Sequence, residues 1–470
     1  MIVGAGLGGL AAAALLARAG HQVTVLDQNS WVGGKSRRIE VAGQRIDTGP
    51  SLVTFAPVID ELFARYDALA SPGATPAAQL ANLTLEPLPE VGRYFYRDVA
   101  VDLPVPPGHE WHDAWQRFEH EHGGLQPEIV RLLTSDPNDV RTLPAVFALL
   151  KRYGRRLSTS AYLRGQGDMP DGLKEVIAIH TLNAGIAPER TLALYATMPA
   201  VMARESITVP VGGVYELTLA LERLAVAAGA EIRCDTAVTS VRKGRVDTAT
   251  GHLDADVVVM ATDSTVADRL LGRAPSRPSR VSCSGVALFT VLDEPLPQGT
   301  VTHSVIMPDD PKALHAALDR REEPDQTMAF VNYYAPGHIY PNNKATAAIL
   351  LTAPANGEHY SLESPFVQRE LERISARMGL ERPLAQRIEA SQVLDPQYFS
   401  GFGGEGGSLY GVTRPIWQGG PFHRPGYTSW RRPWLWRVGA SVHPGGGIPA
   451  VLGGAMNSAD KLLRRIGAAH

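Results

Sequence analysis

The order of apolar runs and glycines in residues 1–27 predicts a strand, a helix and a second strand. Residues 1–3 form a short apolar run that leads into a glycine-rich turn, and an Ala/Leu-rich run continues to Ala19. A second apolar run, residues 21–26, ends at Asp27. Parallel strands are buried on both faces and therefore read as continuous apolar runs. We expect a parallel strand–helix–strand unit at the start of the chain.

The turn inside this unit has the glycine spacing of a dinucleotide-binding turn. Gly4, Gly6 and Gly9 give the pattern Gly-x-Gly-x-x-Gly. The first glycine permits a tight turn, the second lets the backbone approach a pyrophosphate, and the third allows close packing of helix on strand. Free N–H groups at the helix start favour phosphate, and Asp27 can accept hydrogen bonds from a ribose. The motif predicts a dinucleotide without identifying it.

Two more glycine-containing segments follow Asp27. Residues 33–38 read Gly-Gly-Lys-Ser-Arg-Arg, which can bring backbone and a cation close to a phosphate or a flavin edge. Residues 39–46 alternate about a glycine and predict a hairpin, which leads into Asp-Thr-Gly-Pro-Ser at 47–51. The two glycines at 33–34 alone are typical of an ordinary loop. Together with residues 47–51 at this distance, they form a more specific sequence signal.

The hydrophobic pattern of the remaining chain changes several times. Helical spacing dominates the part after residue 55, together with one β-hairpin at 91–103. The apolar runs 229–234, 237–241 and 253–260 follow a helix and predict a return to the parallel sheet. Later apolar runs predict a mixed sheet covered by a helix at 364–378. We therefore predict a dinucleotide-binding domain built from residues 1–54, 207–275 and 431–470, a helical and substrate region at 55–206, and a substrate-binding domain at 276–430.

Composition narrows the class of protein. A chain of 470 residues suggests two or three domains. The net charge of -3 offers no basic excess for nucleic-acid phosphates. Cys234 and Cys283 form neither a metal spacing nor a disulfide framework, which favours a reducing compartment. No apolar run reaches the roughly 18 residues of a membrane span, and the first residues already form a strand, so we expect no signal peptide.

Together these motifs resemble the two-dinucleotide-binding-domain flavoproteins, a superfamily that includes amine oxidases, protoporphyrinogen oxidases and carotenoid desaturases. The resemblance implies FAD, with Asp27 on the adenosine ribose. It also implies that Val238 contacts the adenine through its backbone and that Ala261 faces the pyrophosphate. Two positions depart from the pattern, because Asp27 stands where Glu is commoner and Lys35 stands where Arg is commoner. Lysine keeps the charge but loses the bidentate fork. The expected cofactor-binding residues are Gly4, Ala5, Gly6, Gly8, Gly9, Asp27, Gln28, Gly33, Gly34, Lys35, Ser36, Thr48, Gly49, Pro50, Ser51, Val238, Ala261, Gly439, Gly447, Ile448 and Pro449.

Three segments sharpen this resemblance. Residues 47–51, the Gly-Gly-Ser-Leu-Tyr-Gly corner at 406–411, and Ser-Val-His-Pro-Gly-Gly-Gly-Ile-Pro at 441–449 resemble bacterial carotenoid desaturases, the phytoene desaturase and hydroxycarotenoid 3,4-desaturase group. The implied fold is α/β, with a Rossmann-type FAD-binding domain, a mixed-sheet substrate domain and a helical region that faces substrate or membrane. The implied reaction removes two vicinal hydrogens from a polyene, with hydride transfer to the flavin. The final electron acceptor stays open between oxygen and a quinone.

Acid–base residues for this reaction are weakly marked in the sequence. Glu405 and His443 lie in glycine-rich segments and could take a proton, although a structural role is commoner for each. No metal site is expected. The later aromatics could line a substrate tunnel or belong to the core, and these are Trp417, Phe422, Tyr427 and Trp430.

A lipophilic polyene also implies contact with a membrane surface. Aromatic residues at 111–118 and a basic cluster of Lys151, Arg152, Arg155 and Arg156 are compatible with an interfacial helix. The aromatic stripe fits a core better, and the basic cluster fits a solvated helix face equally well. We expect a cytoplasmic, peripheral membrane protein. The alternatives left open are a carotenoid isomerase, an FAD-dependent amine or amino-acid oxidase, and a non-catalytic flavin-containing binding protein.

Overall fold

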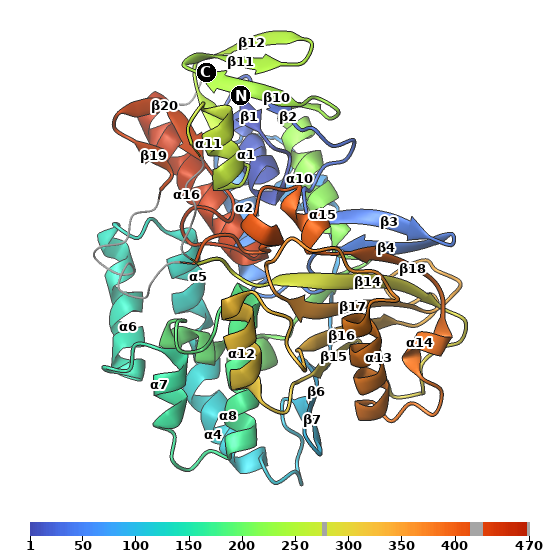
Figure 1. The fold of residues 1–470 in the computed structure, drawn as a ribbon. Coiled ribbons are helices and arrows are strands. Elements are labelled where there is room, and N and C mark those ends of the chain that lie inside the picture. The colour runs from blue at the N-terminus through green and yellow to red at the C-terminus, as the bar shows by residue number, and fades with distance from the viewer. Residues whose placement is uncertain (275–279, 414–425, 468–470) are drawn as a thin grey trace.

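The predicted strand–helix–strand unit forms the centre of a six-stranded sheet with the order β19-β20-β13-β1-β2-β9 (Figure 1). The computed structural model describes residues 1–274, 280–413 and 426–467. All neighbouring strands of this sheet pair in parallel except β19 with β20. The strands are β1 (Ile2–Val3), β2 (Thr24–Leu26), β9 (Glu231–Arg233), β13 (Val258–Met260), β19 (Thr428–Ser429) and β20 (Arg432–Arg437).

Helix α1 (Leu7–Arg18) packs between α10 (Tyr215–Ala227) and α16 (Ile448–Ile466). Its Ala/Leu-rich sequence is buried from Gly8 to Ala17, so small side chains let the neighbouring helices approach closely. The first and last parts of the chain therefore lie against each other, which brings the N-terminal glycine turn beside the C-terminal glycine cluster.

One expectation for the parallel sheet is wrong. Run 229–234 returns to the sheet as β9, and the end of run 253–260 returns as β13. Run 237–241 does not return to it. Strands β10 (Val238–Arg242), β11 (Gly244–Thr248) and β12 (Gly251–Ala255) form a separate antiparallel sheet. Their connections are only one or two residues long, and such short connections permit antiparallel pairing alone. The run 253–260 is accordingly split between β12 and β13.

A seven-stranded mixed sheet has the order β18-β14-β17-β16-β15-β6-β7. Helix α13 (Pro365–Arg377) covers one face, as predicted, and buries Phe366 and Leu371 there. The sheet also includes the hairpin β6–β7, because β6 pairs in parallel with β15. The division into domains stays a prediction. The strands are β6 (Gly92–Tyr96), β7 (Val99–Leu103), β14 (Ser284–Leu292), β15 (His303–Ile306), β16 (Ala329–Tyr334), β17 (Thr346–Ala353) and β18 (Ile388–Leu394).

A group of helices lies beside this sheet, below the six-stranded sheet in Figure 1. Trp111, Trp115 and Phe118 are buried there, which confirms the core interpretation of this stripe. No helix in the described part of the chain is long and apolar enough to cross a membrane. The helices of this group are α4 (His112–His122), α5 (Gln126–Thr134), α6 (Leu143–Tyr153), α7 (Thr159–Arg164), α8 (Asp171–Ala178) and α9 (Met198–Glu205). Helix α2 (Pro57–Ala68) instead packs on α1 and α16, and α3 (Ala77–Ala81) packs on α10.

Shorter elements complete the described chain. The hairpin predicted at 39–46 is present as β3 and β4, and its strands contact the seven-stranded sheet. These elements are β3 (Arg37–Val41), β4 (Gln44–Thr48), β5 (Leu85–Pro87), β8 (Thr208–Pro210), α11 (Ser264–Leu270), α12 (Pro311–Arg320), α14 (Leu384–Arg387) and α15 (Pro396–Ser400).

Candidate functional site

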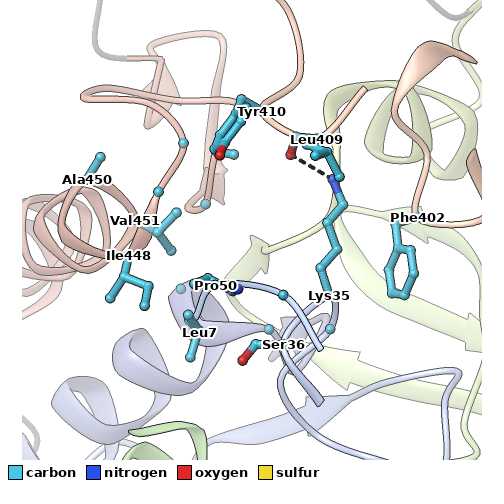
Figure 2. A pocket seen from close by; sticks show the side chains of 18 of the residues that line it. Leu7, Lys35, Ser36, Pro50, Phe402, Leu409, Tyr410, Ile448, Ala450 and Val451 are labelled. Carbon is cyan, nitrogen blue, oxygen red and sulfur yellow. Dashed lines mark hydrogen bonds between the residues drawn. The ribbon is translucent and has the colours of Figure 1, made fainter. Parts of the chain in front are cut away.

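A cavity of about 590 Å³ begins at the carboxyl ends of β1 and β13 and continues along one face of the seven-stranded sheet. The carboxyl edge of an open parallel sheet is the usual place for a ligand. The start of α16 lies across this cavity from Lys35, with Leu7 and Pro50 between them (Figure 2). Residues from both ends of the chain therefore line the same cavity.

Two helices begin at the cavity without a side-chain cap. Helix α1 follows Gly6 and helix α16 follows Gly447, and neither glycine supplies a capping oxygen. Helix N-termini offer N–H groups and a partial positive charge to an anion. A Cβ atom added at Gly6 would find no atom within 4 Å, so this backbone borders open space. These features fit a pyrophosphate.

The other two glycines of the first turn serve packing. Gly4 has φ of +105°, a conformation that side chains disfavour. A Cβ on Gly9 would lie 2.1 Å from the carbonyl oxygen of Gly4, so only glycine lets α1 approach β1 this closely. The roles expected from the sequence match this geometry.

Asp27 is held at the end of β2 by backbone donors. Its Oδ2 accepts a hydrogen bond from Ala5 N–H at 2.7 Å, and its Oδ1 accepts one from Asn29 N–H at 2.9 Å. The side-chain amide of Asn29 donates a second hydrogen bond to Oδ1 at 2.9 Å, so the site that is left for a ligand is on Oδ2. The side chain is buried yet lines the cavity, so it can receive a hydroxyl of a ribose.

Lys35 reaches across the cavity to the glycine-rich corner at 406–411. Its Nζ donates hydrogen bonds to the carbonyl oxygens of Leu409 at 2.9 Å and Ser408 at 3.4 Å (Figure 2). Burial lowers the pKa of Lys35, and the nearby carboxylate of Asp263 partly offsets this effect. The lysine thus ties the N-terminal unit to a segment far along the chain and keeps a cation at the cavity.

Most residues expected to bind the cofactor meet at this cavity, although they come from widely separated parts of the sequence. The exceptions are Ala5, Gly9 and Thr48, which do not line the cavity but contact residues that do. Ala5 holds Asp27, Gly9 packs on Gly4, and the hydroxyl of Thr48 donates to the carbonyl of Lys35 at 3.3 Å. The lining residues are Gly4, Gly6, Gly8, Asp27, Gln28, Gly33, Gly34, Lys35, Ser36, Gly49, Pro50, Ser51, Val238, Ala261, Gly439, Gly447, Ile448 and Pro449.

Residues 7–341 match the family described as flavin containing amine oxidoreductase. The chain belongs to this family. The expected cofactor, FAD, and the expected class, an FAD-dependent oxidoreductase, are thereby confirmed. The buried acid, the uncapped helix starts and the open backbone at Gly6 fit FAD, while the individual contacts of each residue with FAD remain predictions.

Related proteins confirm the resemblance to carotenoid desaturases. The chain is 29% identical to 4,4'-diapolycopene oxygenase of Methylomonas sp, over 98% of this chain and 97% of that protein. It is 27% identical to hydroxyneurosporene desaturase of Rubrivivax gelatinosus, over 99% and 93% of the two chains. Putrescine oxidase has the same fold, with a TM-score of 0.65 at 15% identity over 99% of this chain and 98% of that one.

The two proton-accepting candidates lie outside the cavity lining. Glu405 accepts a hydrogen bond from the guanidinium of Arg321 at 3.0 Å, at the end of α12. His443 makes an aromatic contact with Tyr427, with ring centroids 6.5 Å apart. This placement gives no support to a proton-transfer role for either residue, and both roles stay predictions.

The two tunnel candidates that the structure describes, Tyr427 and Trp430, are not in the cavity wall either. Tyr427 is buried, which confirms the core interpretation for this residue, whereas Trp430 is 83% exposed and fits neither the tunnel nor the core. Trp417 and Phe422 lie outside the described residues. The pattern of aromatic residues could not distinguish a tunnel from a core or an exposed loop, because all three environments accept such side chains.

The seven-stranded sheet supplies lining residues that the sequence did not single out. Ala287, Leu350, Phe330 and Tyr94 come from β14, β17, β16 and β6, and cross-strand register places them in one row through Val305. A neighbouring row contains Asn332 and His303. Methionine and leucine side chains from the helical region form the opposite wall, and these are Leu133, Leu194, Met198 and Met202.

Proposed function

We propose that this protein is an FAD-dependent desaturase that removes two vicinal hydrogens from a carotenoid polyene. The observation that carries the proposal is the continuity of the cavity. It joins the two helix starts to an apolar passage between the seven-stranded sheet and the helical region. A rigid apolar chain fits such a passage. Its binding would be driven by the apolar area that is removed from water.

The charges around the cavity favour an uncharged substrate. Among the described residues that line it, the carboxylates are Asp27 and Asp263. Asp27 belongs to the ribose position, and Asp263 lies close to Lys35 at the junction of the two sheets. A protonated amine in the apolar passage would therefore lack a counter-charge, which is costly at low dielectric. This supports a polyene over an amine.

The relatives support the same class of substrate. Phytoene dehydrogenase of Streptomyces griseus is 31% identical over 63% of this chain, and the relatives described above are named for carotenoid substrates. When bound, FAD supplies the hydride acceptor, which is the demanding part of the reaction. The sheet and the helical wall would hold the polyene in one orientation and exclude water from it.

The test is anaerobic mixing of the FAD-loaded protein with acyclic carotenoids, followed by product mass. Desaturation should bleach the flavin absorbance and yield a product lacking two hydrogens. A product that has gained oxygen only in the presence of O2 would indicate an oxygenase instead. Isomerisation with no net flavin reduction, bleaching by putrescine alone, or binding without any conversion would overturn the desaturase in favour of the isomerase, amine oxidase or binding-protein alternatives.

We propose further that helix α6 docks the protein on a membrane. Val140, Leu143, Phe147 and Leu150 are spaced three or four residues apart and expose 74%, 47%, 64% and 51% of their side chains. This spacing places Leu143, Phe147 and Leu150 on one face of α6, and Val140 lies just before them in the 3-10 turn Val140–Thr142. Exposed apolar side chains of this size mark an interaction surface.

The cations that follow this apolar face fit an anionic lipid surface. Lys151, Arg152, Arg155 and Arg156 are all exposed. Among described residues, Arg152 pairs with Glu121 at 3.4 Å and the other three make no ion pair. Helix α6 contacts α5, from which Leu133 lines the cavity, so a carotenoid could pass from the bilayer beneath α6. Each cation contributes on the order of 1 kcal/mol at an anionic membrane.

Liposome sedimentation tests this docking surface. Replacing all four cations by Gln, or Phe147 by Asp, should reduce binding to anionic liposomes, and binding of the parent should weaken with salt. Val226→Asp is the matched control, because Val226 is 54% exposed but lies on α10. Parent-like sedimentation of both α6 variants would assign docking to another surface.

A further inference from the structure

The side of the cavity formed by β15 and β6 contains polar side chains that the proposed flavin chemistry does not use. Tyr94 on β6 and His303 on β15 line it, together with His180 from the 3-10 turn Ile179–Ala184. Three strands lie between β6 and β14 in the sheet. Gly285 of β14 lies next to Leu409, whose carbonyl oxygen accepts the hydrogen bond from Lys35. Neighbouring strands are about 4.8 Å apart, so this polar group is remote from the Lys35 end.

The hydrogen bonds of Tyr94 and His180 fix their donor and acceptor roles. His180 Nδ1 lies 2.9 Å from the carbonyl oxygen of Val176, which only accepts, so Nδ1 carries the proton. In the neutral ring Nε2 is then an acceptor. Tyr94 Oη lies 2.9 Å from this Nε2 and must donate its proton to it. Tyr94, which lines the cavity, therefore keeps lone pairs on its oxygen and has no proton left to give.

The hydrogen bonds of His303 likewise leave it with an acceptor and no free donor. Its Nδ1 lies 2.7 Å from Asn332 Oδ1, while the Asn332 amide nitrogen donates to the carbonyl oxygen of Ala348 at 3.4 Å. Nδ1 of His303 therefore donates, and Nε2 is left as an acceptor. Within residues 1–274, 280–413 and 426–467, this Nε2 has no hydrogen-bond partner on the protein. The ring stacks on Phe330, with centroids 5.3 Å apart, which fixes its plane.

Gly92 leaves the space that the His303 ring occupies. A Cβ atom at Gly92 would lie 2.8 Å from Cδ2 of that ring. Burial also keeps both imidazoles neutral, because desolvation lowers the pKa of His180 and of His303 to about 4. At neutral pH this side of the cavity thus offers two uncharged acceptors, the Tyr94 oxygen and the His303 Nε2.

We propose that Tyr94 and His303 form an acceptor site for a hydroxyl group carried by the polyene. The proposal rests on the desaturase function above and specifies its substrate class as a hydroxylated polyene. A hydroxyl donates its proton to one acceptor and is desolvated at little cost. A ketone or an ether offers no proton, and a hydrocarbon leaves both acceptors unsatisfied, which costs free energy in a buried site.

The experiment uses three matched substrates with the FAD-loaded protein: a terminally hydroxylated acyclic carotenoid, its methyl ether and the parent hydrocarbon. The methyl ether keeps the oxygen but lacks the proton. We expect the hydroxylated compound to exceed the other two about tenfold in kcat/KM and in binding affinity, which corresponds to about one buried hydrogen bond. Binding is measured separately, from the shift of the polyene absorbance in oxidised protein.

Variants then locate the preference. Tyr94→Phe and His303→Phe keep the rings and remove the acceptors, and the double variant should bring the preference for the hydroxylated compound close to unity. Tyr162→Phe is the matched control. Tyr162 pairs with buried His122 at 2.7 Å, as Tyr94 pairs with His180, but neither control residue lines the cavity. The control should keep the full preference.

The outcomes separate the two proposals. Equal affinity of wild type for the hydroxylated compound and its ether would overturn the acceptor site, even if every polyene reduces the flavin. A preference that survives in the double variant would overturn the assignment of Tyr94 and His303. A hydroxyl-selective binding constant without any flavin reduction would leave the acceptor site in place and count against the desaturase.

Discussion

The cavity has two parts that recognise their ligands in different ways. The FAD half, built on the six-stranded sheet with α1, α10 and α16, offers mainly backbone: glycines, helix starts and one buried carboxylate. The substrate half, built on the seven-stranded sheet and the helical region, offers side chains in cross-strand rows. A phosphate can be bound by N–H groups that every residue has, whereas an apolar chain can only be selected by the shape and polarity of side chains.

The largest effect should come from glycines of the FAD half. Gly9→Ala places a methyl group 2.1 Å from the carbonyl oxygen of Gly4, a backbone atom that cannot move without separating α1 from β1. We expect loss of FAD binding and destabilisation by about 1–3 kcal/mol or more, measured by thermal unfolding and flavin content.

Gly6→Ala is the matched variant for Gly9→Ala. Gly6 has φ of -68° and no neighbour within 4 Å of the added methyl group. We expect nearly unchanged stability, within about 0.5 kcal/mol, together with weaker FAD binding because the methyl group occupies the space of the pyrophosphate. Full FAD affinity in Gly6→Ala would place the pyrophosphate elsewhere.

The next largest effect should follow from Asp27→Ala. The change removes the carboxylate that accepts from Ala5 and Asn29 and that is available to a ribose. Loss of a hydrogen bond to a charged group costs roughly 1.5–3 kcal/mol, or about 10–150-fold in FAD affinity. Titration of the apoprotein with FAD measures it. At saturating FAD the preference among polyenes should match the parent, since the substrate half is untouched, and an altered preference would show that the two halves are coupled.

The same contrast explains what could be predicted from the sequence. The glycine turn and Asp27 are local in sequence, and each needs one residue type, so their positions followed from spacing. The wall of the substrate half gave no such signal. Every residue of β14 is buried, so its sequence has no alternation that would tell which face meets the cavity. Tyr94, His180 and His303 lie more than 80 residues apart and meet only through strand pairing and a helical turn.

Sequence position was misleading for residues near the glycine-rich corners. Glu405 stands in such a corner, yet its side chain turns to Arg321. Proximity along the chain to a cofactor-binding segment therefore does not place a side chain at the cofactor, because consecutive residues in a tight turn point in different directions. The return of residues 237–241 to the parallel sheet failed for a related reason, since loop length and not apolar content decided the pairing.

The smallest expected effect is a loss of folding stability in acid, and it again distinguishes the FAD half from the substrate half. Desolvation lowers the pKa of His122 to about 3 in the folded chain, against about 6.5 in an unfolded chain. Between these values the unfolded state binds the proton and the folded state does not, so stability falls as pH drops below about 6.5. One histidine contributes a slope of about 1.4 kcal/mol per pH unit in this window. The histidines of the described residues whose pKa burial lowers, His122, His180, His303 and His315, all lie outside the six-stranded sheet and its helices.

Urea unfolding at pH 7, 6 and 5 (about one unit apart) in His122→Asn should therefore give a lower stability but a shallower dependence on pH than in the parent. Comparing the two proteins cancels the contribution of carboxylates such as Glu370, whose pKa burial raises and which act in the opposite direction. His120→Asn is the control, because His120 lies on the same helix with its side chain exposed and is solvated in both states. If His120→Asn flattens the dependence as much as His122→Asn does, the acid sensitivity does not arise from the buried histidine. If neither variant changes it, the pH dependence of unfolding arises from titratable groups other than these two histidines.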